Sequence, residues 1–484
     1  MNRRIVVMIL LIFYSFTTVA IDDCFEFMSR CDPIEDEKTS QSFIFPRPVY
    51  HNLMAQLSTG WVDLIYEKDH CFLGSIEAVG IYQQSSSMDK LKRYFLINER
   101  EALVIKGDLA PQPTLRDVRA EWVGLPSNFV GTLQINPKQQ QGSLWVEYNQ
   151  DVKKFINNKF LDSLWVAISM PVQFVENDLG LTQTNVQNPG PNNFDIIAAF
   201  NQGLWHFGKL NPKKKHRAGV AEINVKLGAT FMARDGFQIG YYSSIFVPLT
   251  GGQNPEFLFD PFLGNNRHFG FSAGVHFQLP LNDDTDCKLI AFFFDIENLY
   301  LIRSGQRRTL DLMDKPWSRF LLFNNINGDS NIPGVNVLTR KVTVRPFNMA
   351  DLSTGLRFNL GAFDLEIAYN LWVHPSEKLV LEDREFPEIF GIAGTLPFTT
   401  ASKSTISFQA PNDFVFIPIT QFDLDLLSGC ARSAVVHRPS IAAGAIIDRD
   451  CYTIIFGFGA FIEFPQQNTA LNNAGVWGKI GASF

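Results

Sequence analysis

Apolar and polar residues alternate one by one over much of the chain. The clearest stretch is 352–373, in which Leu356 and Ile367 belong to an apolar parity and Arg357 and Glu366 to a polar one. Neighbouring side chains of a strand point to opposite faces, so this pattern predicts strands with one apolar face and one polar face.

The pattern predicts an all-β chain of about 14 strands. We expect these strands at 53–66, 71–83, 129–135, 144–148, 161–174, 221–232, 237–247, 269–279, 289–302, 352–360, 363–373, 441–447, 452–464 and 475–484. Short turns near 235, 283, 361 and 449 alternate with long loops at 177–217, 250–266, 303–346, 375–434 and 465–474. This asymmetry is typical of an antiparallel barrel that crosses a membrane. A secreted β-sandwich would also alternate, but it does not need one end with consistently long loops.

Composition supports a wall that faces lipid. The chain has 44 Phe among 484 residues, and Phe favours strands and suits a lipid-facing surface. Charged residues make up 19%, below the roughly 25% of soluble proteins. The formal net charge is −7, and this acidic balance argues against nucleic-acid binding.

The N-terminus predicts secretion. Arg3 and Arg4 precede the apolar run 5–16, which is shorter than the roughly 20 residues of a membrane-spanning helix. We therefore expect residues 1–20 to be a signal peptide, with a retained anchor as the alternative. Residues 21–50 are predicted to be a periplasmic lead-in, with folding into the barrel mouth as the alternative.

Residues 51–484 are expected to form the barrel, with one insertion. Within 84–127 the prolines and the charged sequence 117–122 interrupt the alternation. We expect this segment either inside the barrel as a constriction or on the periplasmic side.

The last strand carries a further feature. Val476, Ile480 and Phe484 share one parity, and the chain ends on the Phe. In this the sequence resembles the bacterial outer-membrane β-barrels of the porin-like type, in which a terminal Phe is read by the assembly machinery. The resemblance extends to no particular subfamily.

The resemblance implies a transmembrane, antiparallel, up-and-down barrel in the bacterial outer membrane, reached after secretion through the inner membrane. It also implies outer-membrane lipid, lipopolysaccharide and the barrel assembly machinery as partners. The predicted function is a passive pore or transport channel for small solutes. Long loops leave a second possibility, a surface barrel that acts as an adhesin or antigen.

Several side chains of the polar parity are predicted to face the lumen. They are Trp145, Trp165, His276, Arg357, Asp364, Glu366, Trp372, Trp477 and Lys479. The four tryptophans either fill space near strand ends or line a passage that suits sugars or apolar solutes better than bare ions.

A basic run precedes one predicted strand. Lys213, Lys214, Lys215 and Arg217 surround His216 at the expected outer rim. Lysine and arginine bind phosphate, so the run is a candidate site for lipid phosphates. A solvated loop is the alternative.

No motif predicts enzymatic chemistry, a cofactor or a metal. The spacing from Gly203 to Lys209 is that of a phosphate loop, but Leu210 stands where a Ser or Thr is required. The six cysteines form no C-x-x-C unit for zinc. His276 shares its parity with Ser272, which leaves a barrel hydrolase as a remote alternative.

Overall fold

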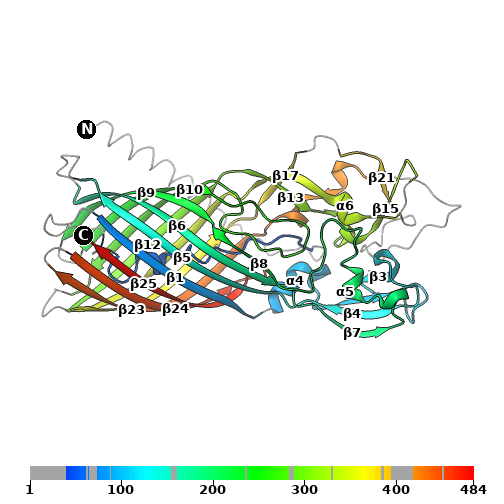
Figure 1. Ribbon diagram of the computed structural model, residues 1–484, viewed down its shortest axis with the longest axis horizontal. Helices are drawn as coiled ribbons and strands as arrows, with labels where there is room; N and C mark the ends of the chain where they lie inside the picture. Colours follow the sequence, from blue (N-terminus) through cyan, green and yellow to red (C-terminus); the bar gives the residue numbers. More distant parts are fainter. Residues whose placement is uncertain are drawn as a thin grey trace.

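Twelve antiparallel strands of the computed structural model close into an up-and-down barrel (Figure 1). Each strand pairs with its neighbours in chain order, and the first strand pairs with the last. The structure describes residues 40–61, 64, 74–87, 89–153, 161–234, 237–282, 288–328, 331–382, 386–393, 418–449 and 452–484. The wall strands are β1 (Gly74–Ser87), β5 (Lys138–Asp151), β6 (Ser163–Asp178), β9 (Glu222–Arg234), β10 (Phe237–Pro248), β11 (Gly270–Pro280), β12 (Lys288–Leu301), β18 (Asn348–Leu360), β19 (Phe363–His374), β23 (Ala434–Arg449), β24 (Tyr452–Pro465) and β25 (Asn472–Ser483).

The wall exposes its apolar face and buries its polar face. On β19 the side chains of Leu365 and Ile367 are exposed, whereas those of Asp364 and Glu366 are buried in the barrel. A soluble sheet would do the reverse, because water would surround its outer face. Only lipid outside and a polar interior account for this arrangement. The chain is therefore a transmembrane β-barrel of the outer-membrane type, as the sequence predicted.

The wall has twelve strands because two of the fourteen predicted strands lie elsewhere. Residues 53–66 were expected to be the first strand, but residues 53–57 form a short helix, α2 (Leu53–Leu57), inside the barrel. Residues 129–135 contain β4 (Val130–Gln134), which belongs to a separate four-stranded sheet.

The two ends of the barrel differ in their connections. The links β9–β10, β18–β19 and β23–β24 contain two residues each, and we call this end the turn end. At the other end, the loop end, long segments join β1 to β5, β6 to β9, β10 to β11, β12 to β18 and β19 to β23. Figure 1 shows most of the small strands and helices of the β1–β5, β6–β9, β12–β18 and β19–β23 segments gathered beyond the loop end. The predicted asymmetry is confirmed.

A first loop lobe is built from residues 89–137 and 179–214. Its sheet has the order β3 (Val118–Arg119), β2 (Leu103–Lys106), β4, β7 (Thr182–Gln187), accompanied by α4 (Asp89–Phe95) and α5 (Ile196–Ala199). Leu103, Ile105, Leu133 and Phe200 are buried in its core. This lobe contains most of the insertion predicted at 84–127. The structure places it at the loop end, outside the lumen in which one of our two alternatives put it.

A second loop lobe comes from the described parts of residues 302–347 and 375–433. It consists of small sheets and one short helix: β13 (Ser304–Thr309), β17 (Thr339–Arg345) and β20 (Lys378–Leu381); β16 (Ile332–Pro333), β15 (Leu322–Asn325) and β21 (Phe390–Ile392); β14 (Asp311–Leu312) and β22 (Leu424–Asp425); and α6 (Gly334–Leu338). It has its own apolar core around Leu310, Leu321, Phe323 and Val342.

The strand β8 (Lys215–Val220) lies beside the wall. It pairs with the loop-end half of β6, whereas β9 pairs with the turn-end half. Ala221 separates β8 from β9, and its backbone N–H donates to the Pro171 carbonyl.

Candidate functional site

One segment of the chain runs through the lumen. We call residues 40–61 the lumen segment. At the loop end Ser42 N–H donates to the Ser428 carbonyl at 2.8 Å. At the turn end the ring of Trp61 lies 5.6 Å from that of His276. Residues 40–50, the described part of the expected lead-in, therefore lie at the loop end and in the lumen. The predicted signal peptide, 1–20, lies outside the described residues.

The middle of the lumen segment forms α2 for local reasons. Leu53, Met54 and Leu57 have high helix propensity, and the Asn52 side chain caps the helix by accepting from Ala55 N–H at 3.3 Å. The helix stops where Thr59 and Gly60 take positive φ angles of 41° and 75°. The Asn cap and the leucines are the sequence features that could have revealed a helix in place of a strand.

Wall side chains satisfy the backbone of the lumen segment. Lys479 Nζ donates to the carbonyls of Gln56 at 2.7 Å and Ser58 at 2.9 Å. Thr59 N–H donates to Glu366 Oε1 at 2.8 Å. Buried backbone groups need such partners. Two residues predicted from their parity thus hold the lumen segment against the wall.

Arg47 makes the most extensive polar contacts of this segment. It forms an ion pair with Asp351 and donates from Nη1 to Asn370 Oδ1 at 3.1 Å. Its Nη1 also lies 3.8 Å from Glu463 Oε1. The guanidinium carbon lies 5.7 Å from the ring centre of Trp372. Four wall residues therefore surround one cation of the lumen segment.

All nine predicted lumen residues are buried inside the barrel. They are Trp145, Trp165, His276, Arg357, Asp364, Glu366, Trp372, Trp477 and Lys479. The ring of Trp145 lies 4.9 Å from Lys226 Nζ, and Trp165 packs edge-on against Trp61 at 6.0 Å. Trp145 and Trp372 line the same cavity, while Trp165 contacts the lumen segment. Trp145 and Trp372 thus each lie beside a cation, and Trp165 packs against Trp61 of the lumen segment.

The cavity between the lumen segment and the wall is small. Its volume is about 40 Å³, and its lining includes His51, Glu222, Glu297, Asp351 and Trp372. A single water needs roughly 10–15 Å³ by this measure, so only a few waters fit. The described residues thus close the barrel here.

A second segment narrows the lumen from the loop end. The connection between β10 and β11, residues 249–269, folds inward, where Gly264 N–H donates to Gln173 Oε1 at 2.8 Å and Asn265 Nδ2 to Glu222 Oε2 at 2.9 Å. Phe262 stacks on Phe43 of the lumen segment, with ring centres 5.9 Å apart. The inward constriction that we placed at 84–127 is thus formed by this loop.

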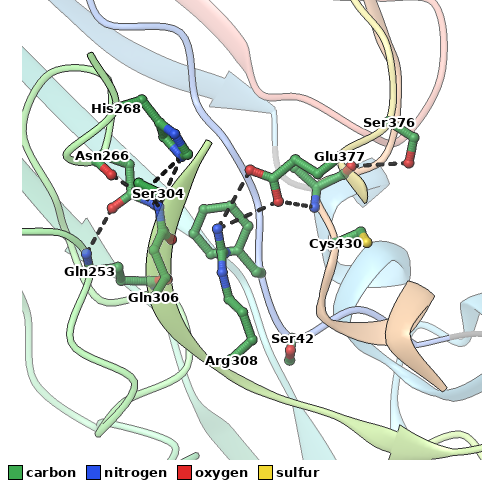
Figure 2. Close-up of polar contacts among 12 residues, drawn as sticks. Ser42, Gln253, Asn266, His268, Ser304, Gln306, Arg308, Ser376, Glu377 and Cys430 are labelled. Atoms are coloured by element: carbon green, nitrogen blue, oxygen red, sulfur yellow. Dashed lines mark hydrogen bonds and ion pairs between the residues drawn. The ribbon is translucent and has the colours of Figure 1, made fainter. Parts of the chain in front are cut away.

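Figure 2 shows two polar groups near the start of the lumen segment. His268 lies against the Ile302 carbonyl, 2.8 Å from Nδ1, and Gln306 Nε2 lies 2.9 Å from His268 Nε2. Burial lowers the pKa of His268 to about 4. Neutral His268 can donate from Nδ1 to the carbonyl and accept at Nε2 from Gln306.

The second group contains a buried ion pair. Arg308 Nη2 lies 3.5 Å from both carboxylate oxygens of Glu377, and Glu377 Oε2 accepts from Ala431 N–H at 2.8 Å. Burial lowers the pKa of Arg308 and raises the pKa of Glu377. The Arg308 guanidinium also lies over the ring of Phe43. This pair anchors the lumen segment to the second loop lobe.

The predicted assembly residues lie on the outer face of β25. Val476, Ile480 and Phe484 are all exposed there. The Phe484 backbone exchanges two hydrogen bonds with Gly74, at 2.9 and 3.2 Å. The terminal residue thus pairs with the start of the first strand, where the barrel closes.

The basic run divides between two directions. Lys214 is exposed and pairs with Glu176 at 2.8 Å, and His216 is exposed beside Phe174. Lys215 lies 3.9 Å from the centre of the Phe257 ring, and Arg217 donates to the Gly252 carbonyl at 3.1 Å. The backbone N–H of Lys213, whose side chain is exposed, donates to Asn211. Within the run, Lys213, Lys214 and His216 are therefore exposed, whereas Lys215 and Arg217 are partly buried against the loop 249–269.

Among the described residues, the candidate hydrolytic pair His276 and Ser272 shares no hydrogen bond. His276 contacts Asp295 through Nδ1, while Ser272 Oγ has no hydrogen-bond partner among the described residues. In the part of the chain that the structure describes, no three His, Cys, Asp or Glu side chains are grouped to hold a metal ion. No helix in the described ranges is long and apolar enough to span a membrane.

Comparison with known proteins identifies similar folds. No protein-family model matches the sequence, and no curated protein does. An outer-membrane channel from Pseudomonas putida F1 is similar in structure, with a TM-score of 0.40, 8% identity and coverage of 86% of this chain and 99% of that chain. The transport unit of the autotransporter AIDA-I from Escherichia coli is similar with a TM-score of 0.34 and 8% identity, and the match covers 91% of this chain and 99% of that chain. A mutant of the TodX monoaromatic hydrocarbon channel is similar with a TM-score of 0.33 and 8% identity, and the match covers 90% of this chain and 98% of that chain.

Proposed function

We propose that this protein is an outer-membrane channel for small solutes, and that the lumen segment closes it in the state described. The observation that carries the proposal is the kind of contact that holds this segment. Lys479, Glu366 and Asp351 bind it through hydrogen bonds and ion pairs inside a polar lumen. Water that enters the lumen can take over these hydrogen bonds, whereas a wall carboxylate that loses its cation needs a new counterion. The segment can therefore leave its position while the barrel wall stays intact.

By the orientation of outer-membrane barrels, the turn end faces the periplasm and the loop end faces the exterior. The protein then reaches the outer membrane by secretion through the inner membrane and is inserted by the barrel assembly machinery. Solutes enter past the two loop lobes and the inward loop 249–269.

The loop lobes favour a second candidate function, recognition at the cell surface. Both have apolar cores of their own, and the second lobe exposes Phe422 and Leu427. A barrel that works only through its lobes has no need to open. Conductance therefore separates the two functions.

The test uses purified protein in planar bilayers and one matched pair of variants. Thr59→Pro removes the N–H that Glu366 accepts and is incompatible with the positive φ at this position. Thr59→Gly keeps the N–H and suits that φ. The channel account predicts discrete openings in the wild type, similar openings in Thr59→Gly and much longer ones in Thr59→Pro. If neither the folded wild type nor Thr59→Pro showed channel openings, the recognition function would be favoured.

A further inference from the structure

The surroundings of Arg47 have the chemistry of a binding site for a cation. Asp351 and Glu463 supply carboxylates, Asn370 supplies an amide oxygen at 3.1 Å, and Trp372 supplies an aromatic face. Carboxylates and amide oxygens accept from the N–H groups of a guanidinium, and an aromatic face attracts a cation. All four groups belong to the wall, whereas the cation belongs to the lumen segment.

The wall of this region carries more carboxylates than cations. Arg438 is bound to Glu463, with Nε 2.8 Å from Oε1. Among the described residues, Arg47 is the cation that pairs with Asp351. Glu297 lines the neighbouring cavity together with Asp351. Its Oε2 accepts from the Tyr242 hydroxyl at 3.4 Å, and no salt bridge to it is found within the described ranges. A buried carboxylate without a counterion is costly, so the wall would recruit another cation if Arg47 left.

The site is also placed where an incoming solute would meet it. Asp351 is three residues from the loop-end start of β18, and Trp372 is two residues from the loop-end limit of β19. The cavity of about 40 Å³ adjoins both side chains. Departure of the Arg47 side chain would enlarge this space by the volume of one guanidinium and its stem.

We propose that Asp351, Asn370, Glu463 and Trp372 form a binding site for the guanidinium or ammonium group of a small cationic solute, which Arg47 occupies until such a solute competes for it. This inference rests on the proposed channel function and names its substrate class. Arg47 acts as an internal competitor, so a cationic solute both fills the site and releases the lumen segment.

The test is chemical rescue of a vacated site. Arg47→Ala protein in detergent is heated with millimolar methylguanidinium, with methylurea as a neutral isostere and with KCl at equal ionic strength. We expect methylguanidinium to raise the midpoint of heat unfolding saturably by roughly 2 °C, and the two controls to leave it unchanged. The double variant Arg47→Ala/Asp351→Asn should show no saturable rise, and the wild type should need a much higher methylguanidinium concentration for the same rise because Arg47 competes for the site. Arg47→Met, which keeps most of the aliphatic stem, replaces Arg47→Ala if the latter does not fold.

Equal effects of methylguanidinium and methylurea on the Arg47 variant would overturn the proposal. So would an unchanged rise in the double variant. The channel function is tested separately by conductance. Saturable rescue in a protein that never conducts keeps the cation site and removes the channel, whereas conductance without rescue keeps the channel and removes the cation site.

Discussion

Arg357 on β18 donates from Nε to Glu366 Oε1 on β19 at 2.8 Å, inside the barrel. The two residues are directly opposite in the register, as are their neighbours Leu356 and Ile367. Those neighbours are exposed on the outer face. A shift of one residue along the strand thus separates a lumen ion pair from a lipid contact.

Charges on the outer face of this hairpin should be costly. Leu356→Arg or Ile367→Arg places a cation in lipid and should destabilise the barrel by roughly 2–4 kcal/mol near the midplane. Urea titration of protein folded into vesicles measures this change. Leu356→Met is the control and should stay close to the wild type. If both Arg variants were as stable as the wild type, this face would not meet lipid.

The wall could be predicted from the sequence because lipid on one side and polar groups on the other impose a period of two. That period places Arg357 and Glu366 inside and Leu356 and Ile367 outside without any knowledge of the neighbouring strands. The same argument fails where neither face meets lipid. Residues 53–57 form a helix, and residues 129–135 do contain a strand, but alternation alone could not show that this strand lies outside the wall.

The contacts of the lumen segment could not be predicted for a different reason. Arg47 meets Asp351 and Glu463 across separations of hundreds of residues. Such pairings depend on the register of the closed barrel, which a single sequence does not encode locally. The inward loop 249–269 was missed likewise, although the apolar residues Leu258, Phe259, Phe262 and Leu263, all buried, are a signal that an exposed loop would lack.

Phe484 should matter for assembly. Its backbone pairs with Gly74 where the barrel closes, and its ring is exposed on the outer face. Deletion of Phe484 should lower the amount of folded barrel in the outer membrane several-fold, as measured by heat-modifiable migration of membrane fractions. Deletion of Gly203, an exposed residue of the first loop lobe, is the control. Equal yields of the two variants would remove the assembly role.

The divided basic run predicts two different losses. Replacing Lys213, Lys214 and His216 by Gln should weaken retention of lipopolysaccharide and lower heat stability only in micelles that contain it. Replacing Lys215 and Arg217 by Gln should lower heat stability in every detergent, since these residues contact the loop 249–269. If both sets of changes behave alike in the two media, the outward residues do not bind lipid phosphates.

His268 should make the loop end sensitive to mild acid. Burial lowers the pKa of His268 from 6.5 to about 4. Between these two pH values the histidine is protonated in the unfolded chain but not in the folded one. Stability is therefore complete above pH 6.5 and falls as the pH drops towards 4. Proteolysis of the loop lobes should be faster at pH 5 than at pH 7 in the wild type.

The control for this prediction is His268→Gln, which should lose that part of the pH dependence. Asp425 acts in the opposite direction, because burial raises its pKa to about 6 and its folded form binds a proton first. The difference between the two proteins therefore isolates the histidine. A pH dependence that is identical in both would assign the effect to other groups.

A cross-link between the lumen segment and the wall tests the central claim most directly. A Cβ atom at Gly457 would lie 3.1 Å from the Thr59 Cβ. A disulfide needs about 3.5–4.5 Å, so residue 59 must move outward slightly, by about 0.4 Å or more, for the bond to form. The measurement is the conductance of Thr59→Cys/Gly457→Cys in a planar bilayer, first oxidised and then after addition of dithiothreitol. Each single variant and the wild type control for effects of the reagent. Closure by the lumen segment predicts no openings with the disulfide formed and openings of wild-type amplitude after reduction. Openings of unchanged amplitude and frequency in the oxidised protein would contradict it.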